Sequence, residues 1–290
     1  MSFAIVTDST SDIAPERARE LGIYVIPLHV IIEGEDLLDQ VEITAEEYTK
    51  RMAASDTLPH TSQPSAGEFK ALFDRIAADG YDGAVFISLC SEWSACYANA
   101  VNVAAEHPLD IRCIDTRNGS AAEGLVVEYA LAMREDGCSI DEVEQGVRQI
   151  LPEAKLLLIP RTLENLVKNG RAPKLAGHLT TMLNIRLGIS PEWPSGEIKV
   201  TRKARGTKRI VVAMMKDCLA FLDEHPTGGV RVLNSGAKEE QELVAQALEG
   251  YSYTNEGTGP IGCTIATHVG VDAIAVCYCP HYEPKTHKEH

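Results

Sequence analysis

The chain has 290 residues, a length typical of a two-domain protein with a sizeable core. Hydrophobic residues make up 44% and charged residues 24%, which excludes wholesale disorder. The formal net charge of −15 argues against a general nucleic-acid binder, because contacts to phosphates require clustered Lys and Arg.

The sequence shows no signal for a membrane span, for export or for a metal site. Its apolar runs, such as residues 23–32 and 274–279, are far shorter than the roughly 20 residues that cross a bilayer. The first residues contain no basic region and meet a carboxylate at Asp8, unlike a signal peptide. Eight scattered cysteines without a C-x-x-C motif predict reduced thiols in a cytoplasmic protein. Cys277 and Cys279 are expected to be buried side chains rather than zinc ligands, because zinc needs four ligands.

The first half of the chain alternates strand and helix signals. Apolar segments predict strands at residues 3–7, 23–32, 84–89 and 111–115. Helix starts are marked by Pro15 and by the capping residues Thr44, Ser65 and Ser139, and two further helices are expected at residues 94–106 and 119–134. Pro27 argues against a central position for the middle of the second strand. This rhythm predicts an α/β domain with a three-layer, mostly parallel arrangement over residues 1–155.

The second half has a different pattern. Strands are predicted at residues 185–189, 196–201, 230–234, 261–268 and 272–278. Helices are predicted at residues 162–168, 172–183, 203–222 and 238–248. Because turns as well as helices join these strands, we expect a mixed α+β domain over residues 156–282, followed by a flexible tail at residues 283–290.

Common catalytic and nucleotide motifs are absent: the chain has no G-x-G-x-x-G, Walker A or G-x-S-x-G pattern. Three hydroxyl-rich segments, at residues 8–12, 61–65 and 88–94, instead fall at predicted strand or helix ends. Turn and capping chemistry explains part of this pattern, Ser65 above all. Neutral hydroxyl donors that converge would also hold a carboxylate.

Three basic or titratable features are further candidates, each with an ordinary structural alternative. His268 ends a predicted strand, where a polar terminus is the simpler interpretation. Arg171 follows Gly170 at a predicted helix end and is compatible with a solvated helix cap. Residues 199–209 contain six basic side chains, which form either a solvated surface or a docking surface for an acidic partner or phosphate.

Several segments together resemble the DegV family of bacterial fatty-acid-binding proteins. The resemblance is carried by Asp8-Ser9-Thr10-Ser11-Asp12, Pro27-Leu28-His29-Val30, Thr61-Ser62-Gln63-Pro64-Ser65, Asn169-Gly170-Arg171 and Arg205-Gly206-Thr207-Lys208-Arg209, with residues 87–97 and 262–273. These segments occur in family order over about residues 3–280. Each motif is weak alone, and the ordered set is specific.

The resemblance implies a two-domain protein that buries a long-chain fatty acid, with no metal and no other cofactor. It places the carboxylate of the acid against Thr61, Ser94 and His268, with Ser62 in the same binding motif. It also implies that the protein is not itself a catalyst. In the family, the protein presents the carboxylate to a separate ATP-dependent fatty acid kinase, which forms an acyl phosphate.

Three arginines, Arg171, Arg202 and Arg205, match the family positions expected to face that kinase. Three departures from the family pattern bear on the ligand site: Ala95-Cys96 replaces Gly-Thr, Val271-Asp272 replaces Pro-Gly, and Asn169 replaces a glycine. An inward-facing Asp272 would weaken binding of an acid. Two other functions are considered: a stand-alone hydrolase or transferase that uses Ser94 with His268, and a lipid-sensing regulatory protein.

Overall fold

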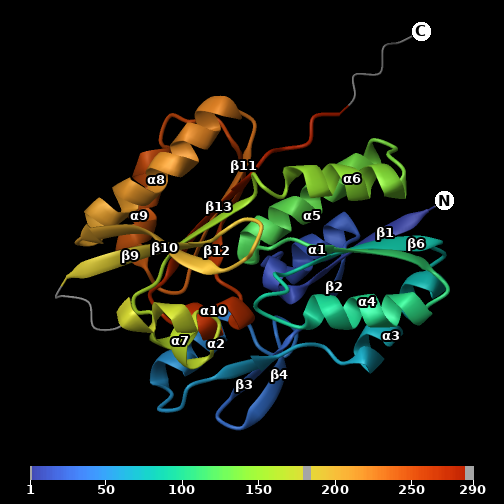
Figure 1. The fold of residues 1–290 in the computed structure, drawn as a ribbon, viewed down its shortest axis with the longest axis horizontal. Helices are drawn as coiled ribbons and strands as arrows, with labels where there is room; N and C mark the ends of the chain where they lie inside the picture. The colour runs from blue at the N-terminus through green and yellow to red at the C-terminus, as the bar shows by residue number, and fades with distance from the viewer. Residues whose placement is uncertain (1, 179–183, 285–290) are drawn as a thin grey trace.

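The computed structural model describes residues 2–178 and 184–284, without the side chains of residues 254–257 (Figure 1). Its first sheet is parallel, in the order β2 (Tyr24–Ile26), β1 (Phe3–Asp8), β6 (Gly83–Ser88) and β7 (Asp110–Asp115). One face is covered by α3 (Ala66–Ala78) and α4 (Cys96–Glu106), and the other by α5 (Ser120–Glu135) and α6 (Ile140–Ile150). The helix α1 (Pro15–Leu21) connects β1 to β2. The predicted three-layer, mostly parallel α/β arrangement is confirmed.

Local sequence signals account for these elements. The hydroxyl oxygens of Ser65 and Ser139 each accept a hydrogen bond from the backbone N–H of the glutamate three residues later. The side chain of that glutamate accepts a hydrogen bond from the backbone N–H of the serine, so both predicted capping boxes form. α3 then turns Phe69 and Phe73 onto the sheet, where Phe69 meets Phe86 edge-on with ring centroids 5.5 Å apart. Burial of each phenylalanine contributes about 1.5–3 kcal/mol. Packing therefore fixes the register of α3 on the sheet.

The second sheet is mixed and has six strands. Its order is β10 (Ile198–Arg205), β9 (Ile185–Pro191), β8 (Lys155–Ile159), β13 (Ile274–Cys279), β11 (Gly229–Asn234) and β12 (Thr254–Pro260). All neighbouring pairs are antiparallel except β11 and β12. α8 (Thr207–Glu224) and α9 (Lys238–Leu248) pack on one face, and the other face turns toward the first sheet (Figure 1). The predicted mixed α+β character is confirmed.

A small antiparallel sheet connects the two parts. It consists of β4 (Glu35–Leu38), β3 (His29–Ile32) and β5 (His60–Ser62), and α2 (Ala45–Ala54) follows β4. The helix α10 (Cys263–Val269) packs against α2, β3 and β5 as well as α7 (Glu164–Lys168). α10 comes late in the chain, whereas α2, β3 and β5 come early. Their packing therefore joins C-terminal and N-terminal segments. A division at residue 155 remains a prediction.

Two predicted strands are corrected. Residues 23–32 form β2 and β3 in different sheets, with the break at Pro27, whose missing N–H interrupts a strand. Residues 261–268 are mostly helical, as α10, rather than a strand. This short apolar run is buried almost throughout, so its hydrophobicity has no periodicity that separates helix from strand.

Other differences concern boundaries. Residues 203–205 extend β10 rather than begin a helix, and α8 starts only after Gly206, whose φ of 83° breaks the extended strand. The predicted helix at 172–183 is a 3₁₀ segment at Pro173–His178, and its last five residues lie outside the described chain. The strand β12 was not predicted. Most of the expected tail, residues 285–290, also lies outside the described chain.

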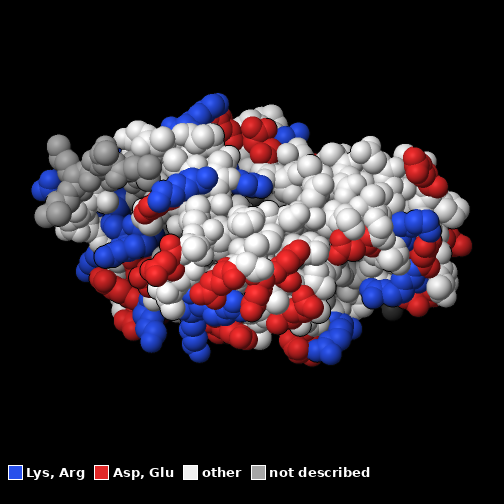
Figure 2. Space-filling model, turned by 90° about the horizontal axis from the view of Figure 1, so that it is seen from below, with Lys and Arg blue, Asp and Glu red and all other residues white. Residues whose placement is uncertain are grey.

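The sequence makes predictions about the state of the cysteines, about membrane spans and metal sites, and about the surface charge. All eight cysteines are free thiols, and all except Cys113 are buried. Within the described residues, no helix is long and apolar enough to cross a membrane, and no group of His, Cys, Asp or Glu forms a candidate metal site. On the face in Figure 2, described Lys and Arg side chains alternate with Asp and Glu instead of forming a continuous basic surface.

Candidate functional site

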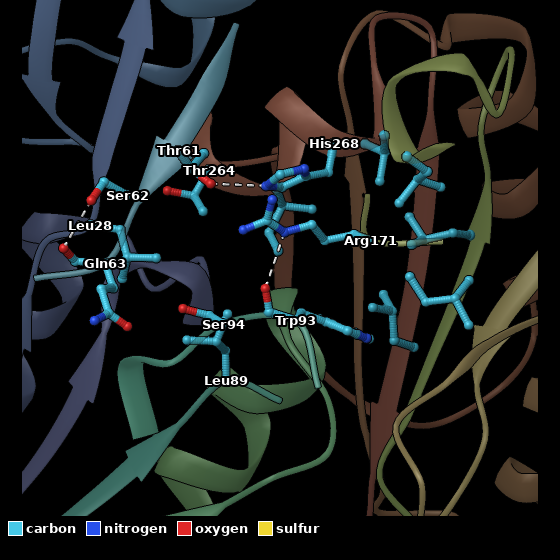
Figure 3. Close-up of a pocket in the computed structure, with 16 residues that line it drawn as sticks. Leu28, Thr61, Ser62, Gln63, Leu89, Trp93, Ser94, Arg171, Thr264 and His268 are labelled. Atoms are coloured by element: carbon cyan, nitrogen blue, oxygen red, sulfur yellow. Dashed lines mark hydrogen bonds between the residues drawn. The ribbon is translucent and has the colours of Figure 1, made fainter. Parts of the chain in front are cut away.

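A cavity lies where the two sheets and the small sheet meet (Figure 3). One wall is apolar and comes from the second half of the chain, with Leu156 and Leu158 of β8 and Ile198 of β10. Leu28 and Leu89 lie on the opposite wall. The cavity volume is about 60 Å³, and its lining also includes Thr61, Ser94, Arg171 and His268. Ser62 lines the cavity as well, so the structure brings five of the predicted site residues to one apolar cavity.

Thr61 and His268 contact each other directly. The Oγ1 atom of Thr61 lies 3.0 Å from Nε2 of His268, across 207 positions in sequence. Thr61 and Ser62 are consecutive residues of β5, so their side chains leave opposite faces of the strand. The Ser62 hydroxyl donates to the carbonyl of Gln63 at 3.3 Å and lies away from His268 in Figure 3. The structure thus joins Thr61, and not the hydroxyl of Ser62, to His268.

The imidazole of His268 is neutral at pH 7. Burial and the positive charge of Arg171 lower the pKa of His268 to about 3. Nδ1 is buried and finds no hydrogen-bond partner among the described residues. A neutral ring carries a single N–H, so His268 serves as one donor and one acceptor rather than as a cation.

Arg171 is placed by a helix-ending turn. α7 ends at Lys168 with Asn169 as its cap residue, and Gly170 follows with a φ of 74°. The N–H of Gly170 bonds to the carbonyl of Val167, and the N–H of Arg171 to that of Leu166. This pair of bonds is a Schellman motif, in which glycine supplies the left-handed residue. The predicted turn Asn169-Gly170-Arg171 therefore fixes where the arginine leaves the helix.

The guanidinium of Arg171 lacks a carboxylate partner within residues 2–178 and 184–284. Its Nε donates to the carbonyl of Trp93 at 3.1 Å, and Nη1 donates to the carbonyl of Asn169 at 2.7 Å. Burial alone lowers the pKa of Arg171 from its usual value. A partly buried positive charge beside an apolar cavity, balanced only by carbonyl dipoles, favours an anion there.

Ser94 lies on the loop between β6 and α4. Its Oγ accepts a hydrogen bond from the backbone N–H of Cys96 at 3.2 Å, which leaves the hydroxyl proton for another acceptor. The start of the same loop is held by the buried carboxylate of Asp8, which accepts from the N–H of Leu89 at 3.0 Å and the hydroxyl of Ser88 at 3.2 Å. The first hydroxyl-rich segment therefore supports the loop that carries Ser94.

The departures from the family pattern at Ala95-Cys96 and at Asp272 do not reach the cavity. Asp272 is exposed in the turn between α10 and β13, where its backbone N–H bonds to the carbonyl of Ser235. Cys96 points its thiol at Asp8, with 3.8 Å from Sγ to Oδ2, and Ala95 is the cap residue of α4. Neither feature places a charge or a bulky group beside Thr61.

Arg202 and Arg205 lie on β10 and do not line the cavity. Two hydrogen bonds of 2.7 and 2.6 Å tie Nη2 of Arg202 to the carboxylate of Asp217. Arg205 is exposed at the end of the strand. A role for both in contacting a kinase remains a prediction.

Comparison with known proteins identifies the family. A family model described as "Uncharacterised protein, DegV family" matches residues 2–281. The chain belongs to the DegV family. A DegV domain-containing protein of Caldanaerobacter subterraneus subsp. tengcongensis is 31% identical over 284 residues, which cover 95% of this chain and 98% of the relative.

Solved structures of similar proteins share the fold. A structure described as fatty acid binding of a DegV family protein from Thermus thermophilus superposes with a TM-score of 0.88 at 26% identity and covers 97% of this chain and 100% of its own. A stearic-acid-binding protein from Eubacterium ventriosum gives a TM-score of 0.85 at 25% identity, covering 96% and 98%.

Two residues of the candidate site were not predicted from the sequence. Trp93 lines the cavity, accepts from Arg171 through its carbonyl, and donates its indole N–H to the carbonyl of Gly196 at 2.8 Å. The sequence indicates Asn169 only as part of the motif Asn169-Gly170-Arg171, but its carbonyl also accepts a hydrogen bond from Arg171. The contacts of Trp93 join residues 78 and 103 positions apart, and no local pattern signals them.

Proposed function

We propose that this DegV protein binds a long-chain fatty acid in the cavity, with its carboxylate at the end formed by Thr61, Ser94, His268 and Arg171. The observation that supports the proposal is the guanidinium of Arg171 beside an apolar cavity, with carbonyl partners and no carboxylate. The related Thermus thermophilus and Eubacterium ventriosum proteins are described as binding fatty acids, which agrees with this ligand class.

The energetics favour such a ligand. Burial of an acyl chain contributes about 0.8 kcal/mol per CH₂ group, or on the order of 10 kcal/mol before the costs of ordering. A carboxylate that leaves water forfeits much of this gain unless donors replace its hydration. Hydroxyl groups on Thr61 and Ser94, the imidazole N–H and the guanidinium are suitable replacements.

Binding requires the cavity walls to separate. The cavity volume of about 60 Å³ is well below the roughly 300–1,000 Å³ that small-molecule sites usually enclose. Its two walls belong to different sheets, with Leu156 and Leu158 on one side and Leu28 and Leu89 on the other. A small displacement between these layers would admit an acyl chain without breaking either sheet.

The bound carboxylate would then be presented to a separate ATP-dependent fatty acid kinase. Arg171 lies at the polar end of the cavity, where a guanidinium can stabilise the charge that develops during phosphoryl transfer. Arg205 and Lys203 are exposed on β10 and provide positive charge for an acidic partner surface. Arg202 contributes less of this charge, because Asp217 neutralises it.

The structure does not favour Ser94 as a nucleophile. A serine nucleophile needs a base within hydrogen-bond reach and a third group that orients the base. His268 instead bonds to Thr61, and its Nδ1 has no acceptor among the described residues. A lipid-sensing role is compatible with the same ligand site, and a reconstituted kinase reaction separates it from the kinase role.

Mass spectrometry of an organic extract of the purified protein tests the ligand. We expect one fatty acid per chain, released by denaturation, because the apolar burial and the four polar groups together favour slow release. A washed, denatured sample of the same protein serves as the control for adsorbed lipid. Absence of fatty acid in the extract, with no uptake of added fatty acid, contradicts the proposal.

A reconstituted kinase reaction tests the presentation. We expect acyl phosphate when the loaded protein, ATP and a bacterial fatty acid kinase are combined. Arg171→Met, at saturating fatty acid, should reduce the rate by about 1,000-fold, the order that a transition-state arginine supplies. Arg161→Met, at an exposed position after β8, is the matched control. Tight lipid binding without acyl phosphate formation would favour the lipid-sensing function.

A further inference from the structure

The side chain of Asn169 bridges the two elements that carry Thr61 and His268. Its Nδ2 donates to the carbonyl of Pro59 at 3.2 Å and, more weakly, to the carbonyl of Thr267 at 3.5 Å. Pro59 leads into β5 two residues before Thr61, and Thr267 precedes His268 on α10. A single amide therefore links the backbone beside both members of the Thr61–His268 hydrogen bond.

The main chain of the same residue holds the guanidinium. The carbonyl of Asn169 accepts from Nη1 of Arg171 at 2.7 Å, while the carbonyl of Trp93 accepts from Nε at 3.1 Å. Figure 3 shows Arg171 lying between His268 and Trp93. The position of the positive charge in the cavity thus depends on where Asn169 places its carbonyl.

We propose that Asn169 is a positioning residue that sets the guanidinium of Arg171 relative to His268. The proposal rests on the proposed function for its ligand, but the geometry is independent of any ligand. Without the amide, the turn after α7 loses its bonds to Pro59 and Thr267, and the carbonyl that holds Arg171 is no longer fixed against α10 and β5. The ligand carboxylate would then meet a less ordered cation.

Asn165 provides a matched control. It lies one helical turn earlier on α7, and its Nδ2 donates to the same carbonyl of Thr267 at 3.0 Å. Asn165 therefore also supports α10, but it contacts neither Pro59 nor Arg171 through any hydrogen bond found in the described chain. Asn169→Gly removes the bridging amide and keeps the carbonyl acceptor, since the φ of −79° and ψ of 0° at this position suit glycine.

A double-mutant cycle on fatty-acid affinity tests the proposal. We expect Asn169→Gly alone to weaken binding about fivefold to tenfold. Arg171→Met should reduce fatty-acid affinity distinctly less in the Asn169→Gly background than in the wild type, because the arginine is already misplaced in that background. In the Asn165→Ala background, Arg171→Met should reduce fatty-acid affinity by the same factor as in the wild type. Additive effects of Asn169→Gly and Arg171→Met would overturn the proposal, as a merely structural role of Asn169 predicts additivity.

A second measurement needs no ligand. The Nε–H of Arg171 is hydrogen-bonded to Trp93, so its exchange with water, followed by nitrogen-15 NMR, reports how firmly the guanidinium is held. We expect exchange at least about fivefold faster in Asn169→Gly and unchanged in Asn165→Ala. Equal exchange in Asn169→Gly and the wild type would overturn the proposal. A wild-type protein that binds no fatty acid would contradict the proposed function, and this result is distinct from the exchange rate of Arg171.

Discussion

Thr61→Val, Ser94→Ala and His268→Ala should each weaken fatty-acid binding about 10- to 100-fold, because a hydrogen bond to a charged group contributes about 1.5–3 kcal/mol. The three side chains line the same cavity. His268→Ala also removes the 3.0 Å contact that orients the Thr61 hydroxyl, so it should have the largest effect of the three. Displacement of a fluorescent fatty acid measures the change.

Two controls isolate the carboxylate. His60→Ala changes an exposed histidine of the same strand β5 and should leave affinity within about twofold, the usual range of a surface substitution. The methyl ester of the fatty acid has the same acyl chain without the charge. The three variants should bind this ester about as well as the wild type. Unchanged affinity for the free acid in all three variants would show that the carboxylate lies elsewhere.

The sequence predicts local structure well where local signals decide it. The capping serines of α3 and α6 lie three residues from their partners, and both helices begin where those boxes place them. α10 is different. The carboxylate of Asp39 accepts from the backbone N–H groups of Cys263 and Thr264 across 224 and 225 positions in sequence. A short apolar run becomes a helix here because a distant carboxylate satisfies its first N–H groups.

The candidate site also has features that the sequence predicts and features that depend on distant contacts. The family resemblance indicates seven site residues, and five of them line one cavity, although their roles remain predictions: Thr61, Ser62, Ser94, Arg171 and His268. Arg202 and Arg205 lie outside its lining. The opposite directions of Thr61 and Ser62 follow from strand geometry once β5 is known. The contacts of Asn169 with Pro59 and Thr267 were not predictable, because they depend on how α7 packs against α10.

Buried carboxylates beneath the site lead to a prediction about stability. The hydroxyl of Thr10 lies 2.5 Å from Oδ1 of Asp8 and 2.9 Å from Oε2 of Glu123, and all three residues are buried. A hydroxyl has a single proton and cannot donate to both carboxylates. One carboxyl group must therefore be protonated and donate to Thr10.

Glu123 is the protonated member. Asp8 also accepts from the backbone N–H groups of Thr10 and Leu89, which favour its charged form. Glu123 accepts only a further hydroxyl, from Thr7 at 3.0 Å, among the contacts within the described chain. Burial and the nearby charge of Asp8 raise the pKa of Glu123 well above its usual value of 4.5.

The sign of the pH dependence follows from this raised pKa. Above about pH 4.5, the unfolded chain ionises Glu123 while the folded protein keeps it protonated. The folded state then binds more protons, so the free energy of unfolding falls as the pH rises toward the pKa of Glu123 in the folded protein. The loss approaches about 1.4 kcal/mol per pH unit for one proton.

Glu123→Gln should therefore reduce the decline in stability between pH 5 and pH 8. The amide N–H₂ can donate to Thr10 in place of the carboxylic acid, and its carbonyl can accept from Thr7, so the buried bonds are kept. Urea denaturation at several pH values measures the slope, and Glu106→Gln, at an exposed position, is the control. Asp8, Asp12 and Asp39 also have raised pKa values, so part of the slope should persist. An identical slope in Glu123→Gln and the wild type would mean that Glu123 is ionised in the folded protein and that Asp8 holds the shared proton.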